Sequence, residues 1–281
     1  MHFRTGFQFT IYFFILSSEV NGVFIIELLH YCKRIRMSEN KDKVFDKVFT
    51  KPSDFKFNNK VAGVFDDMVN RSVPYYEEMQ RMISELTVDH VQENTSVYDL
   101  GCSTGTTMIH MNPVIPDGIT FTGVDDSPEM LEKCRQKLSE FGFTRKVDLQ
   151  LADLNKDVSI SNASVVVLCL TLQFVRPINR EKLLKKIFNG LVPGGVVIVL
   201  EKIIAENSDF NRDFIKYYYD LKRRKDYSEM EISQKREALE NVLIPYKLSE
   251  NIILFKEAGF GSIEVFFKWY NFTGFIAKKT V

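Results

Sequence analysis

The chain has few of the residues that build metal centres and disulfide frameworks. Its 281 residues include four cysteines and four histidines, and the cysteines form no CxxC pair and no cluster with histidine. This spacing argues against structural zinc and against a disulfide scaffold, and it suits a reducing cytosol. Lysine plus arginine equals aspartate plus glutamate, at 37 each, so no global field draws the protein toward nucleic acid or an anionic membrane.

The N-terminal part also lacks an apolar run of the roughly 20 residues that span a bilayer. Residues 7–16 and 23–29 are apolar but too short, so a membrane anchor is disfavoured. An additional amphipathic hairpin is one alternative, and an artefact of an upstream start codon is another. We favour the artefact, because Met37-Ser-Glu-Asn-Lys is typical of a cytosolic N-terminus. We therefore expect residues 1–36 to be a non-native or disordered extension and residues 37–281 to form one domain.

Short apolar strands alternate with amphipathic helices through the middle of the chain. The pattern predicts strands at 96–100, 120–124, 147–151, 164–170 and 195–200, and helices at 106–111, 127–141 and 180–191. Ser127-Pro128-Glu129 is a typical helix start. Gly194-Gly195 is predicted to end a helix and restart a strand. Such alternation predicts a parallel sheet with helices on both faces.

The flanking segments have different patterns. Helices are predicted at 61–69 and 75–86, with Pro74 in the first turn of the second helix. Residues 210–243 form a charged helical stretch with a predicted break at Asp226-Tyr227-Ser228, and Ser228 with Glu231 forms a capping box after it. A helix at 248–258 and an antiparallel strand pair at 262–269 and 273–278 end the chain.

The segment Val97-Tyr-Asp-Leu-Gly-Cys-Ser-Thr-Gly105 is the most informative in the chain. A strand runs into two glycines, which allow the backbone to approach a nucleoside closely. We expect the Asp99 carboxylate to hold this turn by accepting backbone N–H groups. Asp125 and Asp153 follow at later strand ends, and this order of acids predicts a binder of S-adenosylmethionine (SAM).

Each acid has a predicted contact and a structural alternative. Asp125 is placed to accept both ribose hydroxyls, or else to cap the following helix. Asp153, with the amide of Leu154, is placed to read the adenine edge, or else is a loop acid. Gly101, Cys102 and Ser103 would contact the methionine part of the nucleoside through their backbone. Cys102 is not expected to be a nucleophile, because no histidine is placed to deprotonate it.

Four further features lie outside these strand ends. Tyr76 follows Arg71-Ser-Val-Pro74 and is predicted to form a lid over the nucleoside. Arg236 offers a planar fork for a carboxylate, although its spacing also suits a surface pair with Glu240. Residues 222–225 are expected to be a solvated helix face, and His110 is expected to be a packing residue.

Several longer segments together resemble the carboxy-S-adenosyl-L-methionine synthase family. They are Val64-Phe-Asp-Asp-Met, Arg71-Ser-Val-Pro, Val97-Tyr-Asp-Leu-Gly-Cys-Ser, Thr171-Leu-Gln-Phe, Tyr227-Ser-Glu and Glu231-Ile-Ser-Gln-Lys-Arg236. The resemblance runs from about Val44 to the C-terminus. It implies an α/β enzyme with the Rossmann-like class I methyltransferase fold: a mostly parallel seven-stranded sheet, an antiparallel C-terminal hairpin, N-terminal helices and a helical insertion near 207–243.

The resemblance also implies an activity. Members of the family convert SAM and prephenate into carboxy-SAM and phenylpyruvate, without a metal. A companion carboxymethyltransferase then uses carboxy-SAM to modify the wobble uridine of tRNA. The expected enzyme is therefore a cytoplasmic homodimer that binds neither nucleic acid nor membrane directly.

By motif position, the resemblance places the nucleoside against residues spread along the chain. They are Tyr76, Gly101, Cys102, Ser103, Asp125, Asp126, Asp153, Leu154, Cys169 and Arg236. Arg236 would also be the catalytic residue that binds the added carboxylate, reaching across from the partner subunit. The family usually has asparagine at the position of Cys169, and a thiol cannot replace an amide as both donor and acceptor. A side-chain contact is therefore in doubt there, whereas a backbone contact could survive.

Two other functions compete with this interpretation. An ordinary SAM-dependent methyltransferase acting on a small molecule or tRNA would share Asp99, Gly101 and Asp125, but it gives no reason for Arg236 or for the Arg71-Ser-Val-Pro74 segment. A non-catalytic SAM-sensing module would fit Cys169 as a sign of lost activity. The identity of a ligand released from the purified protein separates the three.

Overall fold

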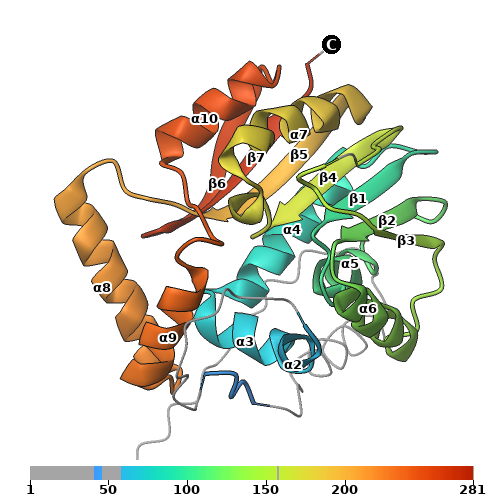
Figure 1. Ribbon diagram of the computed structural model, residues 1–281. Helices are drawn as coiled ribbons and strands as arrows, with labels where there is room; N and C mark the ends of the chain where they lie inside the picture. Colours follow the sequence, from blue (N-terminus) through green and yellow to red (C-terminus); the bar gives the residue numbers. More distant parts are fainter. Residues whose placement is uncertain (1–40, 46–57, 157, 281) are drawn as a thin grey trace, which may run out of the picture. The chain divides into compact units, whose positions relative to one another are not determined.

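Seven strands form one sheet, and helices pack around it (Figure 1). The computed structural model describes residues 41–45, 58–156 and 158–280, so the predicted extension 1–36 lies outside the described residues. The spatial order of the strands is β3-β2-β1-β4-β5-β7-β6. They are β1 (Ser96–Leu100), β2 (Thr120–Asp125), β3 (Val147–Leu151), β4 (Ala163–Cys169), β5 (Leu191–Lys202), β6 (Ser262–Trp269) and β7 (Phe272–Lys278).

The pairing confirms the predicted Rossmann-like sheet. Strands β1 to β5 pair in parallel, whereas β7 pairs antiparallel to both β5 and β6. The helices are α2 (Asn59–Ala62), α3 (Phe65–Ser72), α4 (Tyr76–His90), α5 (Thr106–Met111), α6 (Pro128–Glu140), α7 (Pro177–Gly190), α8 (Ser208–Arg224), α9 (Glu229–Leu239) and α10 (Leu248–Glu257), with a 3-10 turn η1 (Leu172–Phe174).

Helices cover both faces of the central strands, which explains their uninterrupted apolar sequences. Val166 and Leu168 of β4 pack in one core with side chains of α7 and α10. Successive side chains of a strand point to opposite faces, so Val165 and Val167 face the other layer, where α4 contacts β4 and β5. The edge strand β3 is only partly buried. The central strands are therefore buried from both sides, next to the site described below.

Two local predictions about helix ends were wrong. Pro74 lies before α4 rather than in its first turn, because Tyr75 adopts a left-handed conformation (φ 52°) and the helix begins at Tyr76. Helix α7 ends at Gly190, and Gly194 and Gly195 lie inside β5. The pairing of β4 with β5 shifts register at this point, and the Gly194 N–H donates to the Lys279 carbonyl oxygen at 3.0 Å. The glycine pair thus accommodates an irregular strand instead of starting one.

The C-terminal helical insertion has the predicted break. Helix α8 ends at Arg224, and Asp226 has a positive φ of 62°. Helix α9 then starts with a complete capping box, in which Ser228 accepts the Glu231 N–H and the Glu231 carboxylate accepts the Ser228 N–H.

Among the residues that the structure describes, none of the helices is long and apolar enough to cross a membrane.

Candidate functional site

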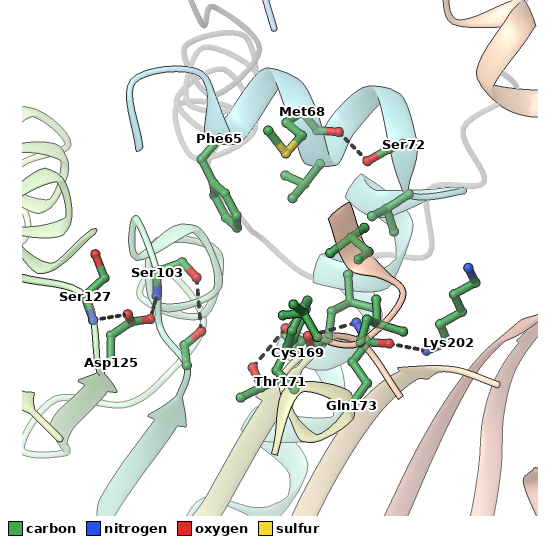
Figure 2. A pocket seen from close by; sticks show the side chains of 18 of the residues that line it. Phe65, Met68, Ser72, Ser103, Asp125, Ser127, Cys169, Thr171, Gln173 and Lys202 are labelled. Carbon is green, nitrogen blue, oxygen red and sulfur yellow. Dashed lines mark hydrogen bonds between the residues drawn. The ribbon is translucent and has the colours of Figure 1, made fainter. Parts of the chain in front are cut away.

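A cavity of about 760 Å³ lies at the carboxyl ends of the parallel strands. This edge of an open α/β sheet is where ligands usually bind. Figure 2 shows side chains from β2, β4, β5 and α3 around the same space. All ten residues predicted to contact the nucleoside line this cavity: Tyr76, Gly101, Cys102, Ser103, Asp125, Asp126, Asp153, Leu154, Cys169 and Arg236. Residues up to 160 positions apart in the sequence are therefore brought together.

The glycine turn is held by the neighbouring strand. The Gly101 and Cys102 N–H groups donate to the Val124 carbonyl oxygen at 2.7 and 3.0 Å. Gly101 has a φ of 78°, and a Cβ built there would lie 2.4 Å from Thr171 Oγ1. Ser103 also has a positive φ, 49°, which is unusual for a residue with a side chain. The turn thus places bare backbone against the cavity, as close approach of a nucleoside requires.

Asp125 takes the structural role that was predicted for Asp99. Its Oδ2 accepts the Ser103 N–H at 2.9 Å and its Oδ1 accepts the Ser127 N–H at 3.0 Å (Figure 2). Burial raises the pKa of Asp125 to about 6, against the effect of these hydrogen bonds. Each carboxylate oxygen has two lone pairs, so each keeps capacity for a ligand hydroxyl. Asp125 therefore both orients the turn and faces the cavity.

The expectation that Asp99 holds the turn was wrong. The residue is 1% exposed, and neither carboxylate oxygen has a hydrogen-bond partner within the described part of the chain. Burial, and then the charge of Asp125, raises its pKa to about 7. The N–H groups of the turn donate instead to the Val124 carbonyl oxygen and to the Asp125 carboxylate.

Asp126 and Asp153 line the cavity just after the ends of β2 and β3. Asp126 is exposed, and burial and then the charge of Asp153 raise its pKa. Asp153 accepts the Asn155 N–H at 2.9 Å and pairs with Lys156 at 3.5 Å. Its neighbour Leu154 also lines the cavity. The two acids therefore sit together beside the ends of β2 and β3.

Cys169 ends β4 in the middle of the cavity (Figure 2). The Gln80 Nε2 lies 3.5 Å from its Sγ, and the Gln80 Oε1 has no hydrogen-bond partner in the described structure. Burial, and then the charge of Asp99, raises the pKa of the Cys169 thiol to about 12, so the thiol stays protonated. The next residue, Leu170, has a positive φ of 60°. Two strained residues, Ser103 and Leu170, thus border one cavity, which is typical of a functional site.

The other two chemical candidates behave as packing groups. Cys102 is 4% exposed, and the pKa of its thiol is raised by its hydrogen bond to Cys134 and by burial. This environment disfavours the thiolate, which is the nucleophilic form. Burial, and then the charge of Lys137, lowers the pKa of His110 to about 4, and His110 does not line the cavity.

Arg236 lines the cavity from helix α9 with an exposed side chain. No ion pair joins it to Glu240, the partner that its spacing suggested, and no carboxylate within the described residues pairs with it. Its guanidinium is therefore available to an anion. Tyr76, at the start of α4, also lines the cavity and lies near Cys169 and Asp99.

The Arg71-Ser-Val-Pro74 segment fixes the insertion that carries Arg236. Arg71 Nε and Nη2 donate to the carbonyl oxygens of Lys225 and Asp226, each at 2.9 Å. Its Cζ lies 4.1 Å from the centroid of the Tyr227 ring, whose hydroxyl donates to Asp42 Oδ2 at 2.7 Å. Arg71 therefore clamps the α8–α9 junction onto α3 with its planar fork.

Sequence reasoning missed three lysines that also line the cavity: Lys202, Lys222 and Lys235. Residues 222–225 were expected to be solvated together, but Lys222 is 5% exposed whereas its three successors are exposed. The available signal was the spacing of Tyr218 and Lys222, which places both on one face of a helix. Lys202 is the last residue of the buried strand β5, and no local pattern distinguishes it.

No group of three or more histidine, cysteine, aspartate or glutamate side chains in the described chain could hold a metal ion. The charged groups lining the cavity include the carboxylates of Asp125, Asp126 and Asp153 after β2 and β3, and four cations from β5, α8 and α9 together with Glu240. This arrangement suits a ligand with a ribose hydroxyl pair and a separate anionic group.

Comparisons with known proteins agree with this geometry. A family model described as "Methyltransferase domain" matches residues 97–195. A protein of Methylococcus capsulatus named carboxy-S-adenosyl-L-methionine synthase is 51% identical over 85% of this chain and 100% of its own length. A protein of the same name from Desulfotalea psychrophila is 44% identical over 86% of this chain and 99% of its own length.

Solved structures support the fold at much lower identity. Human N-acetylserotonin methyltransferase in complex with SAM superposes with a TM-score of 0.55 and 18% identity, over 90% of this chain and 66% of its own. The methyltransferase SibL gives a TM-score of 0.56 and 15% identity, over 90% and 69%. The sheet is thus that of SAM-dependent methyltransferases.

Proposed function

The chain belongs to the carboxy-S-adenosyl-L-methionine synthase family, and from this premise we propose that it converts SAM and prephenate into carboxy-SAM and phenylpyruvate. The observation that carries the proposal is the convergence of all ten motif residues on one cavity. Three parts of this proposal rest on family resemblance alone. They are prephenate as the second substrate, phenylpyruvate as the second product, and the later use of carboxy-SAM on tRNA wobble uridine in the cytoplasm.

The residues present fit a sulfonium nucleoside. The turn at Gly101 is a cradle that a Cβ would fill, and it presents backbone to the methionine part. Asp125 is buried at the end of β2 with lone pairs left for the two ribose hydroxyls. Asp153 and Leu154 lie one strand further, where the adenine would follow. Tyr76 would close the cavity over the ligand.

Arg236 is assigned to the carboxylate that SAM acquires in the reaction. It is a cation without a carboxylate partner among the described residues, and it lines the same cavity as the nucleoside motif. A guanidinium binds a carboxylate with two parallel hydrogen bonds, so it favours the product state and the charge that precedes it. In a homodimer, which we propose by family resemblance, the partner subunit's copy of this helix could supply the same group.

The chemistry that we propose needs no protein nucleophile. Prephenate aromatises to phenylpyruvate and releases carbon dioxide and hydroxide. The hydroxide removes a proton from the SAM methyl group and becomes water, and the resulting ylide carbon forms the new bond to carbon dioxide. The protein's part is to exclude bulk water and to hold the anionic groups, because either water or diffusion would remove the reactive species.

Ligand identification tests the proposal directly. The purified protein is denatured and the released ligand is weighed, and SAM plus prephenate is then offered to ligand-free protein. Carboxy-SAM, heavier than SAM by one carbon dioxide, is the expected product in both experiments. Formation of the demethylated nucleoside with a methylated acceptor would instead favour a conventional SAM-dependent methyltransferase, and no turnover with either would favour a sensing module.

A further inference from the structure

The cavity contains a cluster of buried cations beyond the nucleoside motif. Lys202 of β5, Lys222 of α8 and Lys235 of α9 all line it. Lys222 and Lys235 are each 5% exposed, and Lys202 is half-buried. Lysine is almost never buried so completely unless it is paired.

One of the three has a carboxylate partner. Lys235 Nζ lies 4.0 Å from Asp42 Oδ2 and 3.4 Å from Ser72 Oγ. Within the described chain, Lys202 and Lys222 form no ion pair, and their ammonium nitrogens lie 5.0 and 4.6 Å from the centroid of the Tyr218 ring. A cation over a ring face is stabilised far less than one paired with an anion. These two lysines therefore have no anionic partner in the described structure.

These two lysines lie close enough to bind one small molecule. Both distances end on the same Tyr218 centroid, so the two ammonium groups lie within about 10 Å of each other. Tyr219 and Phe272 also line the cavity, and their ring centroids lie 6.3 and 5.2 Å from that of Tyr218, so they add apolar surface beside it. An anion with a compact apolar body matches this combination.

The cluster is separate from the predicted nucleoside contacts. Lys202 ends β5, which is three strand positions from β2, where Asp125 lies. At the usual spacing of strands, this separates the two residues by about 14 Å. Figure 2 shows Asp125 and Lys202 on opposite sides of the pocket, with Cys169 and Gln173 between them. The nucleoside and the lysine ligand would thus occupy adjacent parts of one cavity.

Mutual repulsion and burial show that the cluster is poorly stabilised without an anion. Burial, and then the charges of Lys235 and Lys202, lowers the pKa of Lys222 well below its usual range. Burial lowers the pKa of Lys202 to about 8. A structural role alone would be served better by neutral side chains of the same length.

We propose that Lys202 and Lys222 form, against Tyr218, the subsite for a dianionic second substrate with an apolar body. Two unpaired cations are matched by two carboxylates, one for each ammonium group. This inference rests on the proposed function, because that reaction has a second small-molecule substrate. The inference assigns Lys202 and Lys222 to the binding of that substrate. It also predicts that dicarboxylates bind more tightly than monocarboxylates of the same shape.

The experiment uses two single variants and a matched control. Lys202→Met and Lys222→Met keep the side-chain length and remove the charge. Lys216→Met makes the same change on α8, at an exposed lysine that does not line the cavity. Calorimetry on SAM-loaded protein compares an unreactive dicarboxylate, phenylmalonate, with its monoanion analogue, phenylacetate. Steady-state turnover gives the KM for prephenate, and a SAM titration checks the nucleoside site.

The expected result is selective loss of dianion binding. Each cavity variant should weaken phenylmalonate binding and raise the KM for prephenate by roughly 10- to 100-fold, while SAM affinity changes less than about threefold. Lys216→Met should match the wild type. Unchanged phenylmalonate affinity and prephenate KM in both cavity variants would overturn the inference, and so would equal binding of the mono- and dianion by the wild type.

The same data separate this inference from the proposed function. Lysine-dependent binding of phenylmalonate without formation of carboxy-SAM would retain the subsite and reject the proposed reaction. Formation of carboxy-SAM with a prephenate KM that does not depend on Lys202 or Lys222 would retain the reaction and reject the subsite.

Discussion

Replacing Gly101 by alanine tests whether the glycine turn depends on close packing against Thr171. A Cβ at residue 101 would lie 2.4 Å from Thr171 Oγ1 and 2.5 Å from its Cγ2, distances that real Cβ atoms do not show. The left-handed φ of 78° adds strain for any residue with a side chain. The conformational part should cost about 1–2 kcal/mol and the steric part about 1–3 kcal/mol of unfolding free energy.

A second substitution separates the two contributions. Thr171→Ala removes both clashing atoms and leaves only the Thr171 Cβ, 3.0 Å away. The variant loses a 3.3 Å hydrogen bond to the Cys169 carbonyl oxygen, which is worth about 1 kcal/mol. The double variant should therefore be more stable than the sum of the single effects by about 1–3 kcal/mol. The control is Gly118→Ala, where φ is 87° but no atom lies within 4 Å, so only the conformational cost should appear.

Urea unfolding of ligand-free protein measures the stabilities, and calorimetric titration with SAM follows the site. Gly101→Ala should weaken SAM binding at least tenfold by displacing the turn, and Thr171→Ala should restore part of that loss. Additive effects of the two substitutions, or equal costs for Gly101→Ala and Gly118→Ala, would refute the steric explanation.

Three further predictions concern the charges around the cavity. Arg236→Ala should reduce carboxy-SAM formation at least 100-fold and SAM affinity less than about threefold. Arg236→Lys should also have low turnover, because an ammonium group cannot form the two parallel hydrogen bonds of a guanidinium. Unchanged turnover in Arg236→Ala would refute the assignment of Arg236 to the carboxylate. The pKa of Asp99 is near 3.8 in the unfolded chain and about 7 in the folded protein, so ionisation of Asp99 lowers the stability as the pH rises from about 4 to 7. Asp99→Asn should therefore raise Tm at pH 8 but not below pH 4. A change in Tm that does not depend on pH would contradict this explanation. Arg71→Met should lower the unfolding free energy by about 1–3 kcal/mol and speed hydrogen exchange in α8 and α9, whereas Arg224→Met on the exposed face should not.

Local sequence patterns were sufficient to predict most of the fold. Strands β1, β3 and β6 and helix α5 have the predicted bounds, because alternation, caps and turns act over a few residues. The Ser127 cap and the Ser228–Glu231 capping box were predicted for the same reason. The motif residues meet at one edge because parallel strands end there together.

The predictions failed where packing between distant segments decides the outcome. Gly194 lies inside β5 because its N–H pairs with Lys279, a residue far along the chain. Asp99 does not hold the turn because Asp125, from the next strand, already does. Lys222 is buried because α8 turns that face toward β5, although its neighbours are solvated. The first two outcomes leave no mark within a short window of sequence, whereas the third leaves only the four-residue spacing of Tyr218 and Lys222.

The insertion explains how a methyltransferase sheet could serve a different reaction. The sheet is shared with solved methyltransferases at 15–18% identity, so the fold alone does not set the chemistry. Lys222 lies on α8, whereas Lys235 and Arg236 lie on α9, and all three face one cavity. Arg71 clamps the junction between these helices, so one guanidinium on α3 orients the cations on both. Because buried cations repel one another, they require such a rigid support, and this gives the Arg71-Ser-Val-Pro74 segment a physical role that a nucleoside site alone would not require.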